Sequence, residues 1–300
     1  MSQSKLAQPL EFTGERFTPE CVREIWYEHC HRYAFAAELV KGRRVLDAAC
    51  GEGYGSALLA KHAATVVGMD IDAASVNHAQ GRYGGLPNLS YQCGDATALE
   101  LPDDSFDVIV SFETLEHVHE HERMLAGFAR VLKDDGVLII SSPDKANYSD
   151  AVGHDNPHHV RELYRQELED LLAQHFPAVR LLAQKLVFQS FLWDVDTQPT
   201  TAHTHTADQS GQAQAGLRYP ALYYVAICAR RPNLLPQFGP ALWTFGDANE
   251  SVYSHYNEEI RKIIAAGHRL IEQDAEIARL RQALVAAGGN PDKPTNEQES

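Results

Sequence analysis

The segment SFETLEHVHEH, residues 111–121, combines carboxylates and imidazoles at a spacing that could do chemistry. Glu113, Glu116 and His117 stand at positions i, i+3 and i+4, so they would share one face of a helix. His117 could then take the proton of a hydroxyl group as a general base. The three side chains could instead hold a hard divalent cation such as Mg²⁺. The plainer alternative is that Glu116 and His117 only cap the helix or pair with each other.

A second group of histidines lies in GHDNPHHVRE, residues 153–162, after another apolar strand. Ligands of parallel sheets bind at the carboxyl ends of the strands, so this loop should face the same edge as the first segment. We predict that His159 joins His117 as a catalytic residue. The alternative for His159 is a loop histidine bonded to the backbone. Arg161 could hold an anionic substrate, and it would be equally at home as a surface charge.

Three glycines follow an apolar strand in RVLDAACGEGYG, residues 44–55. A glycine-rich loop between a strand and a helix is typical of nucleotide-type cofactor sites. The dinucleotide fingerprint has glycines at relative positions one, three and six, whereas Gly51, Gly53 and Gly55 occupy one, three and five. Asp47, before the loop, would repel a phosphate but could attract an ammonium group through bound water. S-adenosylmethionine carries that ammonium and no phosphate.

Two further carboxylates end the next strands. Asp70 lies 19 residues after Gly51, where a carboxylate can accept both ribose hydroxyls of an adenosyl ligand. Asp95 follows the next strand and can accept the adenine amino group, and Ala96 offers a backbone N–H. Phe112, just past the fourth strand, is a candidate for a cofactor-facing aromatic residue or a core residue. Carboxylates at successive strand ends, with no basic residue in the loop, favour a phosphate-free adenosyl ligand.

Apolar strands alternate with amphipathic helices from residue 43 onwards. This pattern indicates a parallel sheet that is covered on both faces. No helix separates the last two apolar runs, residues 179–193 and 221–231, which predicts an antiparallel hairpin at the edge of the sheet. The predicted fold class is therefore α/β: a Rossmann-like, seven-stranded, mostly parallel sheet with helices on both faces, a helical N-terminal cap and a long C-terminal helix.

The C-terminal helix repeats Ile263, Leu270, Ile277 and Leu284 every seven residues, which forms an apolar seam of about three heptads. We expect it to associate with a second copy or a partner protein, or to pack back on the parent domain. The predicted segments are an N-terminal cap (1–42), the main domain (43–231, with a mobile loop at 197–216), an irregular linker (232–254), an amphipathic helix or short coiled coil (255–287) and a disordered tail (288–300).

Four motifs in order carry a family resemblance: VLDAACGEGYG, VVGMDID, CGDATALELPDDSFDVIVSFETLEHV and RVLKDDGVLIISSPDK. From about residue 43 to 145 they resemble class I, methyltransferase-11-like, S-adenosylmethionine-dependent methyltransferases, and more loosely so to residue 231. Ala49 stands where the family often has glycine. The resemblance implies S-adenosylmethionine as cofactor, and a noncatalytic protein of the same fold remains an alternative. The predicted cofactor site comprises Asp47, Ala49, Gly51, Gly53, Asp70, Ile71, Asp95, Ala96 and Phe112.

The stretches FTGERFTPE…HRYAFAAELV and NPHHVRELYRQEL look like those of methyltransferases from bacterial cell-surface polysaccharide clusters. This narrower resemblance implies a sugar hydroxyl, or a phosphate on a lipid-linked glycan, as acceptor. It includes a histidine that matches His159. One alternative is a small-molecule O-methyltransferase acting on a quinone-like or natural-product hydroxyl, because quinone-pathway enzymes have similar E-x-x-E-H arrangements. Another is a scaffold of the same fold that recruits a glycan-assembly complex.

The residues before the sheet could form a lid over the cofactor. The candidates are Glu15, Arg16, Tyr27, His31 and Tyr33, of which the two tyrosines could stack on adenine or a sugar ring. The alternative is simple packing of an N-terminal helix against the domain.

Composition excludes several classes of protein. A net charge of −15 repels phosphate backbones, so we expect no nucleic-acid partner. Five scattered cysteines suggest reduced thiols rather than a disulfide scaffold or a structural zinc site. No signal peptide and no apolar run of the ~20 residues that span a bilayer is apparent. We therefore predict a cytoplasmic protein without a transmembrane segment, with peripheral attachment to the inner membrane as an option.

Overall fold

The computed structural model describes residues 18, 24–153, 155–197, 201–239 and 241–291. The chain divides into two compact units, Met1–Phe245 and Gly246–Ser300. The first unit contains the sheet, and the second contains one long helix.

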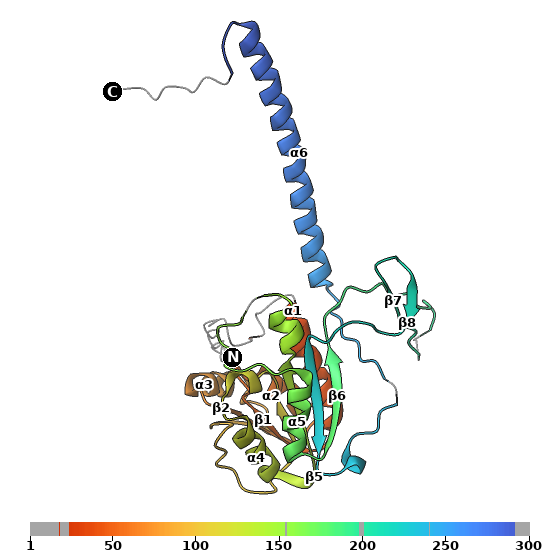
Figure 1. Cartoon of the computed structure of the whole chain (residues 1–300). Helices are drawn as coiled ribbons and strands as arrows, with labels where there is room; N and C mark the ends of the chain where they lie inside the picture. Colours follow the sequence, from red (N-terminus) through yellow and green to blue (C-terminus); the bar gives the residue numbers. More distant parts are fainter. Residues whose placement is uncertain (1–17, 19–23, 154, 198–200, 240, 292–300) are drawn as a thin grey trace, which may run out of the picture. The chain divides into compact units, whose positions relative to one another are not determined.

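The first unit is an α/β fold built on a seven-stranded sheet (Figure 1). The strand order is β3-β2-β1-β4-β5-β9-β6, in which the first five strands are parallel and β9 runs antiparallel to both neighbours. Its larger elements are α1 (Glu24–Leu39), β1 (Arg44–Ala48), α2 (Tyr54–Ala60), β2 (Thr65–Asp70), α3 (Ala73–Tyr83), β3 (Leu89–Cys93), β4 (Phe106–Ser111), α4 (His121–Val131), β5 (Leu132–Pro143), α5 (Arg165–His175), β6 (Ala178–Gln184) and β9 (Tyr223–Ala229). The predicted fold class is confirmed.

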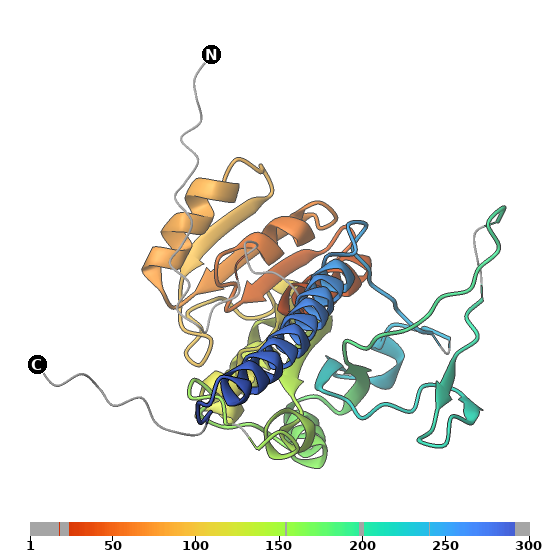
Figure 2. The same ribbon diagram turned by 90° about the horizontal axis from the view of Figure 1, so that it is seen from above.

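Helices cover both faces of the sheet (Figure 2). One apolar cluster packs α1 and α2 against residues such as Val45, Val66 and Val108 of the strands. The other packs α4 and α5 against alternate residues of the same strands, including Leu46 and Ile109. Because successive strand residues point to opposite faces, strands buried on both sides read as continuous apolar runs. This burial explains why the strands were visible in the sequence.

The edge hairpin is also confirmed, with a shorter first strand than predicted. β9 lies between β5 and β6, and β6 ends at Gln184 rather than near residue 193. Beyond it the chain is irregular, and the side chains of Phe191 and Trp193 are 65% and 61% exposed. The pairing of β6 with β9 covers residues 178–184, so the apolar sequence continues beyond the paired part of the strand.

The segment predicted as a mobile loop, 197–216, contains a second small sheet. Strands β7 (His205–Ala207) and β8 (Ala213–Ala215) pair antiparallel around a turn in which Asp208 accepts hydrogen bonds from Ser210 and Gln212. Residues 198–200 lie outside the described part of the chain. The predicted loop therefore contains a hairpin that local side-chain-to-backbone bonds stabilise, and its mobility stays a prediction.

The segment predicted as an irregular linker, 232–254, is largely irregular and partly packed up to residue 250, and it is helical from Ser251 onwards, where α6 begins. After η3 (Pro232–Leu234), Phe238 and Trp243 pack against Phe35 of α1, with ring centroids 6.0 and 5.0 Å from it. Phe245 stacks on His31 at 5.6 Å. Residues 232–245 therefore belong to the first unit, and the boundary between the units falls after Phe245.

The second unit contains helix α6 (Ser251–Ala286), which confirms the long C-terminal helix. The apolar side chains of the predicted seam, such as Ile263 and Leu270, are 45–68% exposed along the helix. Of the predicted disordered tail, residues 292–300 lie outside the described part. None of the described helices combines the length and the apolarity that crossing a bilayer requires.

Candidate active site

The predicted site residues gather at the carboxyl ends of the parallel strands. Ala49 follows β1 with φ +61°, and Glu113 follows β4 with φ +51°. Few non-glycine residues adopt this left-handed conformation, and those that do cluster at functional sites. Two such residues after neighbouring strands mark this edge of the sheet as the place where the chain turns sharply to present side chains.

The glycine loop is held by side chains beneath it. Asp47 is fully buried in β1 and accepts hydrogen bonds from the Ser56 hydroxyl at 2.6 Å and the Tyr33 hydroxyl at 3.2 Å. Burial raises the pKa of Asp47 to about 6, although both hydrogen bonds act to lower it. A ligand ammonium near Asp47 would favour the ionised carboxylate, so this position fits the amino-acid end of S-adenosylmethionine.

Glu52 clamps the loop to helix α3. Its carboxylate is 1% exposed and contacts His78 at 2.8 Å, Arg82 at 2.9 Å and the Tyr83 hydroxyl at 2.9 Å. No local sequence signal marks this role of Glu52, because all three partners lie more than 25 residues away in the chain. These contacts tie the glycine loop to helix α3.

The two outer carboxylates of the predicted cofactor site end β2 and follow β3. Asp70 accepts the Gly51 N–H at 2.8 Å and the Asp72 N–H at 2.9 Å, one on each oxygen. A carboxylate oxygen has a second lone pair, so these bonds leave room for the two ribose hydroxyls. Asp95 accepts hydrogen bonds from the backbone and hydroxyl of Thr97 through Oδ1.

The other members of the predicted cofactor site differ in exposure. Ile71 is 70% exposed directly after Asp70, so an apolar surface is available to an adenine ring there. Ala96 and Phe112 are buried, at 9% and 6% exposure. Phe112 packs edge-on against Tyr33 at 5.1 Å, which fits the core alternative for this residue better than a direct contact with the cofactor.

The acceptor-side segment is not the α-helix that the spacing suggested. The segment contains a single 3₁₀ turn, η1 (Leu115–His117). Glu113 lies before this turn and has the left-handed backbone conformation. Ser141 accepts the Glu113 N–H at 3.0 Å and donates to its carboxylate at 2.6 Å. Arg32 lies 3.5 Å from the same carboxylate. Glu113 therefore faces Arg32 and Ser141 and does not share a helix face with Glu116 and His117.

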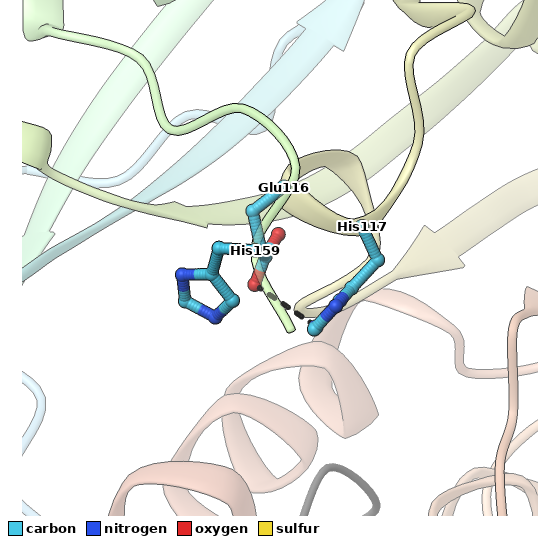
Figure 3. Close-up of side chains that lie close together, drawn as sticks. All are labelled: Glu116, His117 and His159. Carbon is cyan, nitrogen blue, oxygen red and sulfur yellow. Dashed lines mark ion pairs between the residues drawn. The ribbon is translucent and has the colours of Figure 1, made fainter. Parts of the chain in front are cut away.

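The structure instead brings His159 to Glu116 and His117 (Figure 3). One potential ligand atom from each of the three residues lies within 4.8 Å of the others. The imidazole rings of His117 and His159 meet edge-on at 5.0 Å between centroids, and Tyr148 stacks on His159 at 5.3 Å. The two predicted catalytic histidines are 42 residues apart in the sequence, and the loop after β5 brings them together because it returns to η1.

A buried charge network lies under this cluster. The Arg32 side chain is 2% exposed, donates to Gln184 at 2.9 Å and lies 4.8 Å from the centre of the Tyr223 ring. One turn earlier on α1, Glu28 is also buried, and burial raises its pKa to about 7 against the opposing effect of Arg32. No sequence signal marked this pair, because α1 looked like a simple cap.

Three of the five residues predicted to form a lid over the cofactor lie within the described part of the chain. Tyr33 is 5% exposed in the core with its hydroxyl on Asp47, so it positions the loop and does not form part of a movable lid. Tyr27 and His31 pack against Phe245. Glu15 and Arg16 lie outside the described residues.

The chain is similar to several known proteins. Residues 46–140 match the methyltransferase domain family. A probable S-adenosylmethionine-dependent methyltransferase of Mycolicibacterium smegmatis is 39% identical over 172 residues, 56% of this chain and 65% of that protein. A ubiquinone biosynthesis O-methyltransferase of Coxiella burnetii is 38% identical over 107 residues, 34% of this chain and 44% of that protein. The crystal structure of the YcgJ protein of Bacillus subtilis matches at 20% identity with a TM-score of 0.48, over 68% of this chain and 100% of that one.

Residues 46–140 of the chain therefore match a methyltransferase domain, and just over half of the chain is similar to probable S-adenosylmethionine-dependent methyltransferases. The chain spans less than two thirds of the length of the curated relatives it matches.

Proposed function

We propose that this protein transfers a methyl group from S-adenosylmethionine to an oxygen acceptor. The observation that carries the proposal is the shared edge: the glycine loop with Asp70 and the Glu116–His117–His159 cluster lie at the carboxyl ends of neighbouring strands. Cofactor and acceptor sites of such sheets meet at this edge. The glycine loop contains no basic residue, which fits a ligand without phosphate.

The residues of the cofactor side would hold the ligand by its polar groups. Asp70 would accept the ribose hydroxyls, Asp95 the adenine amino group, and Asp47 would attract the ammonium group through water. Bound S-adenosylmethionine supplies a sulfonium methyl that an aligned nucleophile displaces in line. The leaving group is already good, so the chief task of the protein is alignment.

His117 and His159 would activate the acceptor hydroxyl. The Nδ1 atom of His117 lies 3.0 Å from the carbonyl oxygen of His158 and can only donate to it, which places the proton on Nδ1 and a lone pair on Nε2. A neutral imidazole held in this tautomer can accept a proton at Nε2. Two histidines at the same edge as the cofactor loop therefore favour a hydroxyl acceptor over one that needs no proton removal.

For the acceptor itself we propose a sugar hydroxyl or a phosphate of a bacterial surface glycan, from the resemblance of the flanking stretches. The alternative is a quinone-like or natural-product hydroxyl, which the similarity to a ubiquinone biosynthesis O-methyltransferase supports. Helix α6 supports a further role in assembly: its exposed apolar seam would pair with a second copy of this chain or with a partner protein. A scaffold that has lost methylation would use the same helix.

The first test is a calorimetric titration with S-adenosylhomocysteine, the product of methyl transfer, on the wild type and on Asp70→Ala. We expect micromolar binding and a loss of about 100-fold or more in the variant, because two charge-assisted hydrogen bonds are each worth ~1.5–3 kcal/mol. Asp135→Ala, an exposed aspartate at the start of β5, is the control and should bind normally. No binding to the wild type would favour the scaffold.

A further inference from the structure

Glu116 is an unusual carboxylate for a protein interior. Its side chain is 1% exposed, and neither carboxylate oxygen has a hydrogen-bond partner among the described residues. The Nε2 atom of His117 lies 4.0 Å from Oε1 of Glu116. A buried carboxyl group without hydrogen bonds loses the solvation of water and gains nothing in return, so such groups are paired or coordinate metals.

The backbone around Glu116 holds this arrangement in place. The Val160 and Arg161 N–H groups both donate to the Glu116 carbonyl, at 2.8 and 3.1 Å. These bonds join the 3₁₀ turn to the loop that carries His159. The three side chains therefore sit on two segments that are tied together, and their proximity does not depend on one flexible loop alone.

Both histidines also have the partners that metal ligands usually have. His117 donates from Nδ1 to the His158 carbonyl, and His159 places Nδ1 2.6 Å from Oε1 of Glu162. A carbonyl or carboxylate on one ring nitrogen fixes the tautomer and leaves the other nitrogen with a lone pair. In each ring that second nitrogen is Nε2.

We infer that Glu116, His117 and His159 bind a divalent transition-metal ion of the Zn²⁺ type. Two imidazole nitrogens and one carboxylate oxygen are a donor set that suits Zn²⁺, Co²⁺ or Mn²⁺ better than Mg²⁺, which prefers oxygen ligands. Three protein ligands leave a further coordination position open, as in catalytic zinc sites. This donor set differs from the one that the sequence spacing suggested, because Glu113 is engaged with Ser141 and Arg32.

Binding requires two local adjustments. In tetrahedral geometry with bonds of about 2.0–2.1 Å, ligand atoms lie about 3.3 Å apart, so the three side chains must close in from their present limit of 4.8 Å. The Asn156 amide, 3.0 Å from Nε2 of His159, must also give up that hydrogen bond. Both changes are side-chain rotations that leave the backbone bonds of the two segments intact.

The chemical consequence rests on the proposed function. A cation in this position would lie beside the acceptor oxygen and lower the pKa of the acceptor hydroxyl. The O–H proton would pass to solvent, the oxygen would form the new bond to the methyl carbon, and the carbon–sulfur bond would break to leave S-adenosylhomocysteine. The metal would then take over the proton-removing role that His117 has as a free imidazole.

The test uses the full chain, freed of metal by EDTA and dialysis, and titrated with Co²⁺ alone. We expect one tight site with the visible absorption bands of four- or five-coordinate Co²⁺, displaced by Zn²⁺ and not by Mg²⁺. Glu116→Gln and His159→Ala should each weaken Co²⁺ binding by about 10–100-fold or more and change the spectrum. His119→Ala, an exposed neighbour outside the cluster, should leave both unchanged.

Two controls make the outcome decisive. The exposed His203 and His205 could bind Co²⁺ adventitiously, so the double variant His203→Ala/His205→Ala should keep the tight site. S-adenosylhomocysteine binding, measured on every variant, shows that the protein is folded and tests the proposed function separately. The metal site is overturned if the wild type shows no tight Co²⁺ binding, or if Glu116→Gln and His159→Ala bind Co²⁺ as tightly as the wild type. In either case, normal binding of S-adenosylhomocysteine leaves the proposed function standing.

Discussion

On the cofactor side of the site Asp70 receives two backbone N–H groups, whereas on the acceptor side Glu116 is buried with neither oxygen hydrogen-bonded within the described part of the chain. The two carboxylates end up at the same edge of one sheet. The cofactor side is satisfied in the absence of ligand, because its loop supplies its own donors. On the proposed acceptor side the Glu116 carboxylate has no such donors among the described residues, and the proposed metal ion would supply the missing partner.

The largest effect should come from crowding the preformed cofactor side. A Cβ atom at Gly55 would lie 2.0 Å from the ring of the buried Tyr33, so Gly55→Ala forces α1 and α2 apart. We expect a loss of about 3 kcal/mol in unfolding free energy, measured by urea denaturation. Gly85→Ala has nothing within 4 Å of the added atom and should change stability by less than ~0.5 kcal/mol. Equal stability of the two variants would contradict the packing of Tyr33.

Glu28 should make the free energy of unfolding decrease as the pH rises. Its pKa is about 7 in the folded protein against 4.5 for a free glutamate, so the folded state retains the proton longer. The contribution of Glu28 to stability is therefore fully present below pH 4.5 and falls as the pH rises from 4.5 to 7, by about 3 kcal/mol in total, since one pKa unit corresponds to ~1.4 kcal/mol. Glu28→Gln should flatten this slope in denaturation curves measured across that range.

Glu122→Gln, at an exposed position of α4, is the matched control for Glu28→Gln and should keep the slope. If the unfolding free energy of Glu28→Gln falls with rising pH as steeply as that of the wild type, other groups cause the pH dependence and the buried network is not its source.

The direct test of the comparison pairs Asp70→Asn with Glu116→Gln in EDTA. Asp70→Asn loses one acceptor of a backbone N–H and should cost about 2 kcal/mol of unfolding free energy. Glu116→Gln breaks no hydrogen bond between described residues and should cost less than about 1 kcal/mol. A cost for Glu116→Gln as large as that for Asp70→Asn would show that Glu116 has a protein partner and would break the contrast.

The smallest effect on the domain should come from α6, which belongs to a separate unit. Leu270→Asp/Ile277→Asp interrupts the apolar seam and should shift an oligomer to monomer in light scattering, with S-adenosylhomocysteine affinity unchanged. The control His268→Asp/Gln282→Asp carries the same added charge away from the seam. A wild-type protein that is already monomeric would exclude self-association and leave a partner protein as the occupant.

Local sequence patterns determined the element order, the sheet and the cofactor loop. Strands buried on both faces are apolar throughout, and helices repeat every 3.6 residues, so both are visible in a short window. The loop residues Asp47, Gly51 and Gly53 lie within one strand–loop–helix unit, and Asp70 ends the next strand. Their proximity follows from the parallel sheet itself, because the carboxyl ends of neighbouring parallel strands meet at one edge.

Only the tertiary structure decided which side chains gather at the proposed acceptor site. The i, i+3, i+4 spacing suggested Glu113 with Glu116 and His117, but the chain turns at Glu113 with a positive φ and directs its carboxylate to Ser141 and Arg32. His159 takes its place because backbone bonds join two segments some 40 residues apart. Contacts between distant segments depend on loop paths and on packing, which no short window of sequence contains. The same reason explains why the buried Arg32 and the packing of residues 232–245 were visible only in the fold.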